Sequence, residues 1–160
     1  YASQVSVQIE DYLRDVGSFF ATAHRVGGPC DSSCHRCLRD HMNWPWQGLL
    51  DWRLAVDLAQ ILLGGEVDYR RVLGAGSQEA VEKLASDLGV EACNLAGLPA
   101  LRRGGRVAIV THPFITKSAS EYPQWLRAAM DAAEGAEIRL TSDFELAREP
   151  HRVFAWLRGR

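Results

Sequence analysis

The stretch "RVAIVTH", Arg106 to His112, carries β-branched and small apolar residues and has no carboxylate. Such a short apolar run is typical of a buried strand. A second run of this kind, "AEIRLTS", ends at Ser142. Between the two, Ser120 is expected to cap a helix that takes Pro123 in its first turn and ends by Gly135. Strand, helix and strand in this order predict a parallel α/β unit.

Further helices are predicted on either side of this unit. Ser77 is expected to open a helix that runs to about Leu88 and is closed by Gly89. Asp51 is expected to cap another, "WRLAVDLAQILL", which ends at the two glycines that follow. Asp143 is expected to cap a short turn before the C-terminal segment. A helical stripe near the start of the chain consists of Val5, Ile9, Tyr12, Leu13, Val16 and Phe20.

The length of 160 residues fits one domain with a sizeable core. We expect residues 1–65 to form helices that flank a cysteine loop, and residues 66–160 to complete the same core. The predicted fold class is α/β, a short parallel sheet flanked by helices with an inserted cysteine-rich zinc loop. The opening "YASQ" lacks a methionine, so we expect an excerpt of a longer protein. No apolar run approaches the length of a membrane span, which predicts a cytoplasmic protein without membrane contact.

The loop "PCDSSCHRCL" places Cys30, Cys34 and Cys37 in a C-x3-C-x2-C spacing. Clustered cysteines in a chain of this kind indicate a metal rather than disulfides. A tetrahedral zinc ion needs four thiolate or imidazole ligands, and His41 extends the pattern to C-x3-C-x2-C-x3-H. His24, His35 and Cys93 remain alternatives for the fourth ligand, although Cys93 by itself is more typical of a small buried side chain.

The same spacing is found in radical enzymes whose three cysteines hold a 4Fe-4S cluster. Those enzymes usually have an aromatic residue where Arg36 stands, and their loop follows a strand rather than a helix. The residues after the loop are also too few for the βα units of their barrel. An iron–sulfur protein therefore remains the alternative to zinc.

Other motifs carry less information. Gly74 and Gly76 precede a helix as in a nucleotide-binding turn, but Glu79 stands where a third small residue is expected. Neither a P-loop nor a catalytic set is present in the sequence, so this chain alone is not expected to be an ATPase, and its being an enzyme is left open. His112 follows a strand, where α/β sheets place ligands, yet a structural role is more usual. Trp44 and Trp46 are expected to pack over the metal loop, with base stacking as the alternative.

The net charge is −2, and only two of the 18 basic residues are lysines. Arginine forms bidentate contacts with phosphate and carboxylate, so clusters of arginine predict contacts with DNA or with a partner protein. The candidates are Arg36, Arg39, Arg53, Arg102, Arg103, Arg106, Arg148 and Arg152.

The segment from Cys30 to Leu62 resembles the cysteine-bearing C-terminal domain of unknown function that is attached to DEAD/DEAH-box superfamily 2 helicases. Relatives include MrfA-type repair helicases and helicases or partner proteins of the DISARM and Druantia anti-phage systems. The family often has tyrosine at His41 and histidine at Gln47, so His41 as a ligand rests on spacing alone. The resemblance is carried by Ser33, Cys34, Cys37, Leu38, Arg39, Asn43, Leu50, Asp51 and Arg53.

This resemblance implies a bound zinc ion and attachment to the motor domains or a subunit of an ATP-driven DNA helicase, in repair or phage defence. Asn43 and Asp51 are then expected to order the loop through caps and hydrogen bonds around the ligands. A third interpretation is a protein-binding module with a structural zinc, in which the arginines meet carboxylates of a partner.

Overall fold

The chain divides into two compact units, Tyr1–Val67 and Asp68–Arg160. We call them the cysteine unit and the sheet unit. That the two share one core stays a prediction. The computed structural model describes residues 11–16, 18–19, 32–70, 76–115 and 122–159. Cys30, His24 and Ser120, which figure in the expectations above, lie outside the described residues.

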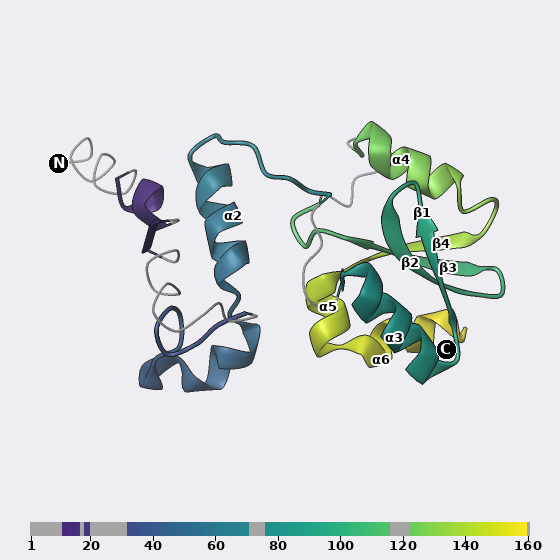
Figure 1. Ribbon diagram of the computed structural model, residues 1–160, viewed down its shortest axis with the longest axis horizontal. Helices are drawn as coiled ribbons and strands as arrows, with labels where there is room; N and C mark the ends of the chain where they lie inside the picture. Colours follow the sequence, from purple (N-terminus) through teal and green to yellow (C-terminus); the bar gives the residue numbers. More distant parts are fainter. Residues whose placement is uncertain (1–10, 17, 20–31, 71–75, 116–121, 160) are drawn as a thin grey trace. The chain divides into compact units, whose positions relative to one another are not determined.

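The sheet unit contains four strands in the order β1-β2-β3-β4. They are β1 (Glu91–Leu95), β2 (Leu98–Arg103), β3 (Arg106–Thr111) and β4 (Glu137–Ser142). β3 and β4 pair in parallel, whereas β1 with β2 and β2 with β3 pair antiparallel. The α/β class and the parallel pair are confirmed. The sheet is mixed, however, because the hairpin of β1 and β2 was not predicted (Figure 1).

Helices cover both faces of this sheet (Figure 1). Successive residues of a strand point to opposite faces, so Val107 and Ile109 of β3 pack in the core with α4 (Gln124–Asp131). Ala108 and Val110 pack in the core on the other face. There they meet α3 (Gln78–Leu88), α5 (Asp143–Arg148) and α6 (Pro150–Leu157).

The predicted ends of α3 are confirmed. The Ser77 hydroxyl accepts a hydrogen bond from the Ala80 N–H at 3.3 Å. At the other end Gly89 adopts φ 64°, the left-handed conformation that glycine reaches without a steric penalty. These local signals therefore fix the helix before any tertiary contact is considered.

Two other helix starts differ from the prediction. α4 begins at Gln124 with Pro123 in the N-cap position, so Pro123 precedes the helix instead of lying in its first turn. Ser142, not Asp143, caps α5, because its hydroxyl accepts a hydrogen bond from the Glu145 N–H at 3.1 Å. Asp143 instead occupies the first turn, where a carboxylate is favoured by the helix dipole.

Gly76 of the glycine-rich turn has a packing role, whereas Gly74 lies outside the described residues. A Cβ atom at this position would lie 2.3 Å from Cβ of Asp143 and 3.1 Å from Cγ1 of Val110. The glycine therefore allows the start of α3 to approach the start of α5 and the end of β3. This close approach is a packing requirement, so the phosphate-binding interpretation of the turn is not needed.

The described part of the cysteine unit consists of helical segments and turns. Residues 11–16 and 18–19 are helical, and the 3-10 helix η1 (His41–Leu49) and α2 (Trp52–Leu62) follow the cysteine loop. Asp51 is the N-cap of α2 as predicted, since its Oδ1 accepts a hydrogen bond from the Arg53 N–H at 3.0 Å. No helix in the described part of the chain has the length and apolar character to cross a bilayer.

Candidate metal centre

Cys34 and Cys37 lie on one tight turn. The Cys34 carbonyl accepts hydrogen bonds from the N–H groups of Cys37 at 3.1 Å and Arg39 at 3.0 Å. This turn brings the two sulfur atoms to 3.7 Å from each other. A disulfide bond is about 2.05 Å long, so the two thiols are not bonded to each other. The turn therefore presents two sulfur atoms together.

The main chain also contacts the sulfur of Cys37. The Cys34 N–H donates a hydrogen bond to Cys37 Sγ at 3.2 Å, which helps to hold this sulfur in place on the turn. Both side chains are half-buried. The described residues contain no group of three or more histidine, cysteine or acidic side chains placed to hold a metal. Cys30 lies outside them, so the turn supplies two of the three predicted thiol ligands.

His41 points to a different partner. Its Nδ1 lies 3.1 Å from Oδ1 of Asp40, and its side chain is 85% exposed. The structure does not place it in a three-ligand group with Cys34 and Cys37. The C-x3-C-x2-C-x3-H spacing is thus present in the sequence, while the imidazole is oriented by the neighbouring carboxylate.

A capping box joins the cysteine turn to η1. Oδ1 of Asp40 accepts a hydrogen bond from the Met42 N–H at 2.8 Å, and Oδ1 of Asn43 accepts one from the Asp40 N–H at 2.8 Å. Nδ2 of Asn43 also donates to the Leu38 carbonyl at 2.7 Å, one residue after Cys37. The predicted ordering role of Asn43 therefore has a direct geometric basis.

A second set of hydrogen bonds ties the loop to α2. The Trp52 N–H donates to the Ser32 carbonyl at 2.8 Å, two residues before Cys34. Asp51, besides capping α2, forms a bidentate pair with Arg53, in which Nη2 lies 2.7 Å from Oδ2. The expected role of Asp51 in ordering the loop is consistent with these contacts. The loop is thus held at both ends by polar contacts rather than by apolar packing.

The aromatic residues after the loop do not form the small core that the sequence suggested. Trp44 is 74% and Trp46 62% exposed, and none of the described residues of η1 is buried. Met42 and Leu49 of the same helix are exposed as well. The expectation that the two tryptophans pack over the metal loop is therefore wrong. η1 instead presents an apolar surface next to the cysteine turn.

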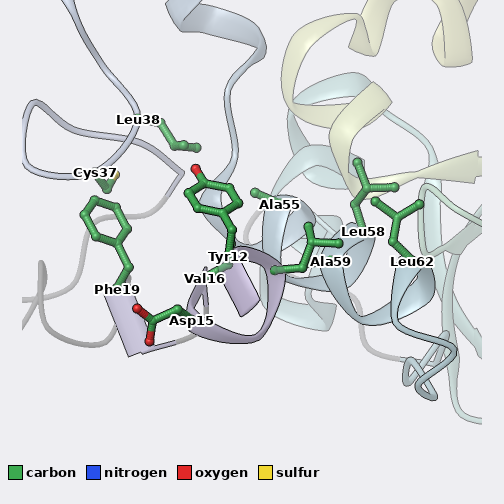
Figure 2. A pocket seen from close by; sticks show the side chains of 11 residues that line it. Tyr12, Asp15, Val16, Phe19, Cys37, Leu38, Ala55, Leu58, Ala59 and Leu62 are labelled. Atoms are coloured by element: carbon green, nitrogen blue, oxygen red, sulfur yellow. The ribbon is translucent and has the colours of Figure 1, made fainter. Parts of the chain in front are cut away.

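A second apolar surface of the cysteine unit forms a groove of about 480 Å³ (Figure 2). Its lining comes from the helical residues 11–16 and 18–19, the end of the cysteine turn and α2. Tyr12 and Leu62, both largely exposed, belong to it, and so does Cys37. The predicted stripe of Tyr12, Leu13 and Val16 therefore faces this groove in the described part of the helix. The remaining lining residues are Asp15, Phe19, Leu38, Ala55, Leu58 and Ala59.

The arginines near the cysteines differ in what they contact. Arg36 is exposed on the turn between the two sulfur atoms. Nε of Arg39 donates to the hydroxyl of the buried Ser33 at 3.0 Å, and Arg53 is held by Asp51. Arg39 and Arg53 therefore support the loop. Of the three arginines, Arg36 is the one whose side chain is exposed for contact with DNA or a partner protein.

Arg103 and Arg106 come together with Arg158, one of the arginines near the C-terminus of the sequence. The three line one pocket of about 330 Å³. Within it Arg106 is held by Glu137 at 2.7 Å and by the carbonyl of Trp156 at 2.7 Å, whereas Arg103 and Arg158 are exposed. The sequence did not predict that Arg158 lies beside Arg103, because the C-terminal helix reaches the β2–β3 turn only through tertiary packing.

The other predicted arginines lie apart from this pocket. Arg102 is half-buried at the end of β2. The Arg148 guanidinium lies 3.8 Å from the centre of the Phe144 ring, and Nη1 of Arg152 lies 2.7 Å from Oε2 of Glu149. Within the sheet unit, the predicted arginines are therefore not gathered into one cluster.

His112 and Cys93 have structural surroundings in the sheet unit. His112 is buried, its Nδ1 accepts a hydrogen bond from the Phe114 N–H at 3.1 Å, and the Tyr69 ring packs edge-on at 5.7 Å. Cys93 on β1 is half-buried against the core beneath α4. A small apolar side chain is the role expected for an isolated cysteine.

No family model, no curated protein and no solved structure matches this chain.

Proposed function

We propose that the chain is a zinc-binding accessory domain of a bacterial ATP-dependent DNA helicase or of a helicase partner, acting in DNA binding or complex assembly in DNA repair or phage defence. Cys30, Cys34 and Cys37 are the proposed thiolate ligands, and His41 is the candidate that spacing offers for the fourth position. The proposal combines the resemblance of the cysteine segment with the local geometry of the turn.

The distance between the two sulfur atoms is the observation that supports this proposal most directly. Two thiolates bound at about 2.3 Å to one tetrahedral zinc ion lie about 3.8 Å apart. Cys34 and Cys37 already stand at 3.7 Å from each other. In a four-iron cluster each cysteine binds its own iron, which requires a wider spacing of the thiolates. The turn therefore favours a single ion over the 4Fe-4S alternative.

Because polar contacts rather than apolar burial hold the loop, bound zinc would contribute to the folding free energy of the cysteine unit. The described residues of the cysteine unit bury few apolar side chains, Ala59 and Val67, so hydrophobic burial there is small. Metal binding to a site that exists only in the folded state adds directly to folding stability. A zinc ion would thus add stability that the described residues of this unit do not gain from apolar burial.

Metal content tests the proposal. We expect protein purified without air to contain one zinc ion per chain and to show no visible absorbance. Iron with inorganic sulfide would replace the zinc proposal by the cluster alternative, and protein without metal would remove both. His41→Ala tests the fourth ligand separately, because retention of zinc in this variant would exclude His41 from the coordination sphere.

DNA binding is tested at the pocket of Arg103 and Arg158, since both guanidinium groups are exposed there. If each contacts one phosphate, replacing both by alanine should weaken binding and reduce the slope of log K against log salt by about 2. Arg152→Ala is the matched control, because Glu149 already pairs with Arg152. Equal binding by the double variant and the control would contradict the DNA role of this pocket.

The exposed apolar surface of η1 favours a second candidate function, a protein-binding module with a structural zinc. Trp44, Trp46 and Met42 project next to the cysteine turn, and aromatic and methionine side chains are enriched in protein interfaces. A gel-retardation assay with DNA at several salt concentrations separates the two functions. If the zinc-loaded protein does not retard DNA, the protein-binding function is favoured.

A further inference from the structure

The outer edge of β4 offers main-chain hydrogen-bonding groups. β4 is the last strand in the sheet order. The Glu137 N–H donates to the Gly105 carbonyl at 2.8 Å, so the main chain of Glu137 faces β3. In a parallel ladder the direction alternates along the strand. The N–H and C=O groups of Ile138 and Leu140 therefore point away from β3, to the side where the described residues place no further strand.

A pocket of about 520 Å³ lies along this edge. Its two sides differ in chemistry, because neighbouring residues of β4 face opposite sides of the sheet. On the side of α4 the lining is largely apolar, and on the side of α5 and α6 it is charged. The apolar side consists of Tyr122, Met130, Ile138 and Leu140, and the charged side of Arg139, Glu145, Glu149 and Arg152.

The charged side is made of two ion pairs. Arg139 pairs with Glu145, and Oε2 of the same glutamate accepts a hydrogen bond from the Thr141 hydroxyl at 2.8 Å. Arg152 pairs with Glu149 at 2.7 Å. Each guanidinium therefore has a carboxylate beside it, and the wall as a whole carries no net charge. A polyanion such as nucleic acid gains little from such a wall, whereas a peptide with side chains of both signs finds a partner for each.

We propose that this edge groove binds an extended peptide segment of a partner protein, which adds to β4 as a fifth strand. Ile138 and Leu140 supply the main-chain hydrogen bonds of this strand addition. The alternating side chains of the peptide are apolar where they face Met130 and charged where they face Glu149 and Arg152. The inference does not depend on the metal, because all of these residues lie in the sheet unit.

A second copy of β4 fits this edge less well than a single strand. Side chains from α4 on one side and from α5 and α6 on the other line the groove at this edge. A second copy would bring its own Met130 and Arg152 against those of the first. An isolated extended segment has no flanking helices, so it enters without this conflict. The groove thereby selects a peptide over self-association.

The test uses peptides selected from a random dodecapeptide library on the full chain, with their dissociation constants measured by fluorescence anisotropy. Leu140→Pro removes the outward N–H and leaves the ladder to β3 intact, because Leu140 does not bond to β3. Leu140→Ala is the matched control that loses the same side chain but keeps the N–H. We expect Leu140→Pro to weaken peptide binding about tenfold relative to Leu140→Ala.

Hydrogen exchange on the unmodified chain supplies a readout that does not require the proline variant to fold. A bound peptide should slow exchange of the Ile138 and Leu140 amides and leave the Arg139 amide, which already faces β3, unchanged. Selection of no peptide, equal binding by the two variants, or protection elsewhere in the chain would overturn the proposal. So would selected peptides without alternation of apolar and charged residues.

Discussion

The cysteine unit and the sheet unit are stabilised by different interactions. In the sheet unit, helices cover both faces of the sheet and apolar side chains fill the two cores between them. In the described part of the cysteine unit, only Ala59 and Val67 are buried apolar residues. Phe114 aside, the large exposed apolar side chains of the described residues all belong to the cysteine unit. Hydrophobic burial thus stabilises the sheet unit, whereas polar contacts hold the described part of the cysteine unit.

The largest effect is expected from Cys34→Ser. In the proposed site, loss of one thiolate would remove zinc, and structural zinc sites supply on the order of 10 kcal/mol of folding free energy. We expect the cysteine unit to lose its amide protection while the sheet unit keeps it, as measured by hydrogen exchange with mass spectrometry. Cys93→Ser is the matched control, because Cys93 lies on β1 and should leave the metal in place. If metal loss unfolds both units equally, the two units are not stabilised by different interactions.

Leu126→Ala tests whether apolar burial stabilises the sheet unit. Leu126 is fully buried in the core beneath α4, so its truncation should lower the free energy of unfolding of the sheet unit by about 2–5 kcal/mol. Leu62→Ala is the control, because Leu62 is largely exposed and its loss should change stability by less than about 0.5 kcal/mol. Urea unfolding measures both. A cost at Leu62 equal to that at Leu126 would mean that the cysteine unit buries this side chain in solution.

Gly76→Ala probes close packing within the sheet unit. The added methyl group collides with Asp143, which should cost about 1–3 kcal/mol in a thermal or urea unfolding experiment. Gly105→Ala adds the same methyl group where no atom lies within 4 Å. Unfolding of both variants at the wild-type midpoint would show that the start of α3 moves away from α5 at little cost.

Asp51→Ala should have the smallest effect of the four. It removes the N-cap of α2 and the bidentate partner of Arg53, with an expected cost of about 0.5–2 kcal/mol. Asp51→Asn keeps a capping oxygen and should restore most of that loss. Zinc affinity, measured by competition with a chelator, should fall in Asp51→Ala if the cap orders the loop. Unchanged affinity would confine Asp51 to capping α2.

Local signals predicted much of the fold. Ser77 and Gly89 marked both ends of α3, Asp51 marked the start of α2, and the apolar run after Arg106 marked β3. These elements were predictable because caps and apolar runs act over a few residues. The parallel pairing of β3 and β4 followed from the helix between them.

The hairpin of β1 and β2 escaped prediction for local reasons. Its turn contains Ala96 at φ 49° followed by Gly97, in place of the Asn-Gly or Asp-Gly pair that usually marks such a turn. Pro99 also argues against a strand in the middle of a sheet. The structure accommodates it because Pro99 pairs with Asn94 of β1, while pairing with β3 starts at Ala100.

The candidate site was predictable only in its ligand types. Three cysteines and their spacing indicated a metal, and the turn that brings Cys34 to Cys37 agrees with this interpretation. The pairing of His41 with Asp40 and the exposure of Trp44 were not predictable, because side-chain orientation depends on neighbours that spacing does not specify. The meeting of Arg103 with Arg158 depends on contacts between distant segments.

Arg106 has a mechanical consequence. Its guanidinium joins the start of β3 to Glu137 at the start of β4, and it also holds the carbonyl and ring of Trp156 in the last turn of α6. A pulling force applied at the end of α6 therefore passes through this arginine into two adjacent strands. The helix and the sheet bear the load together, so α6 resists being peeled off one turn at a time.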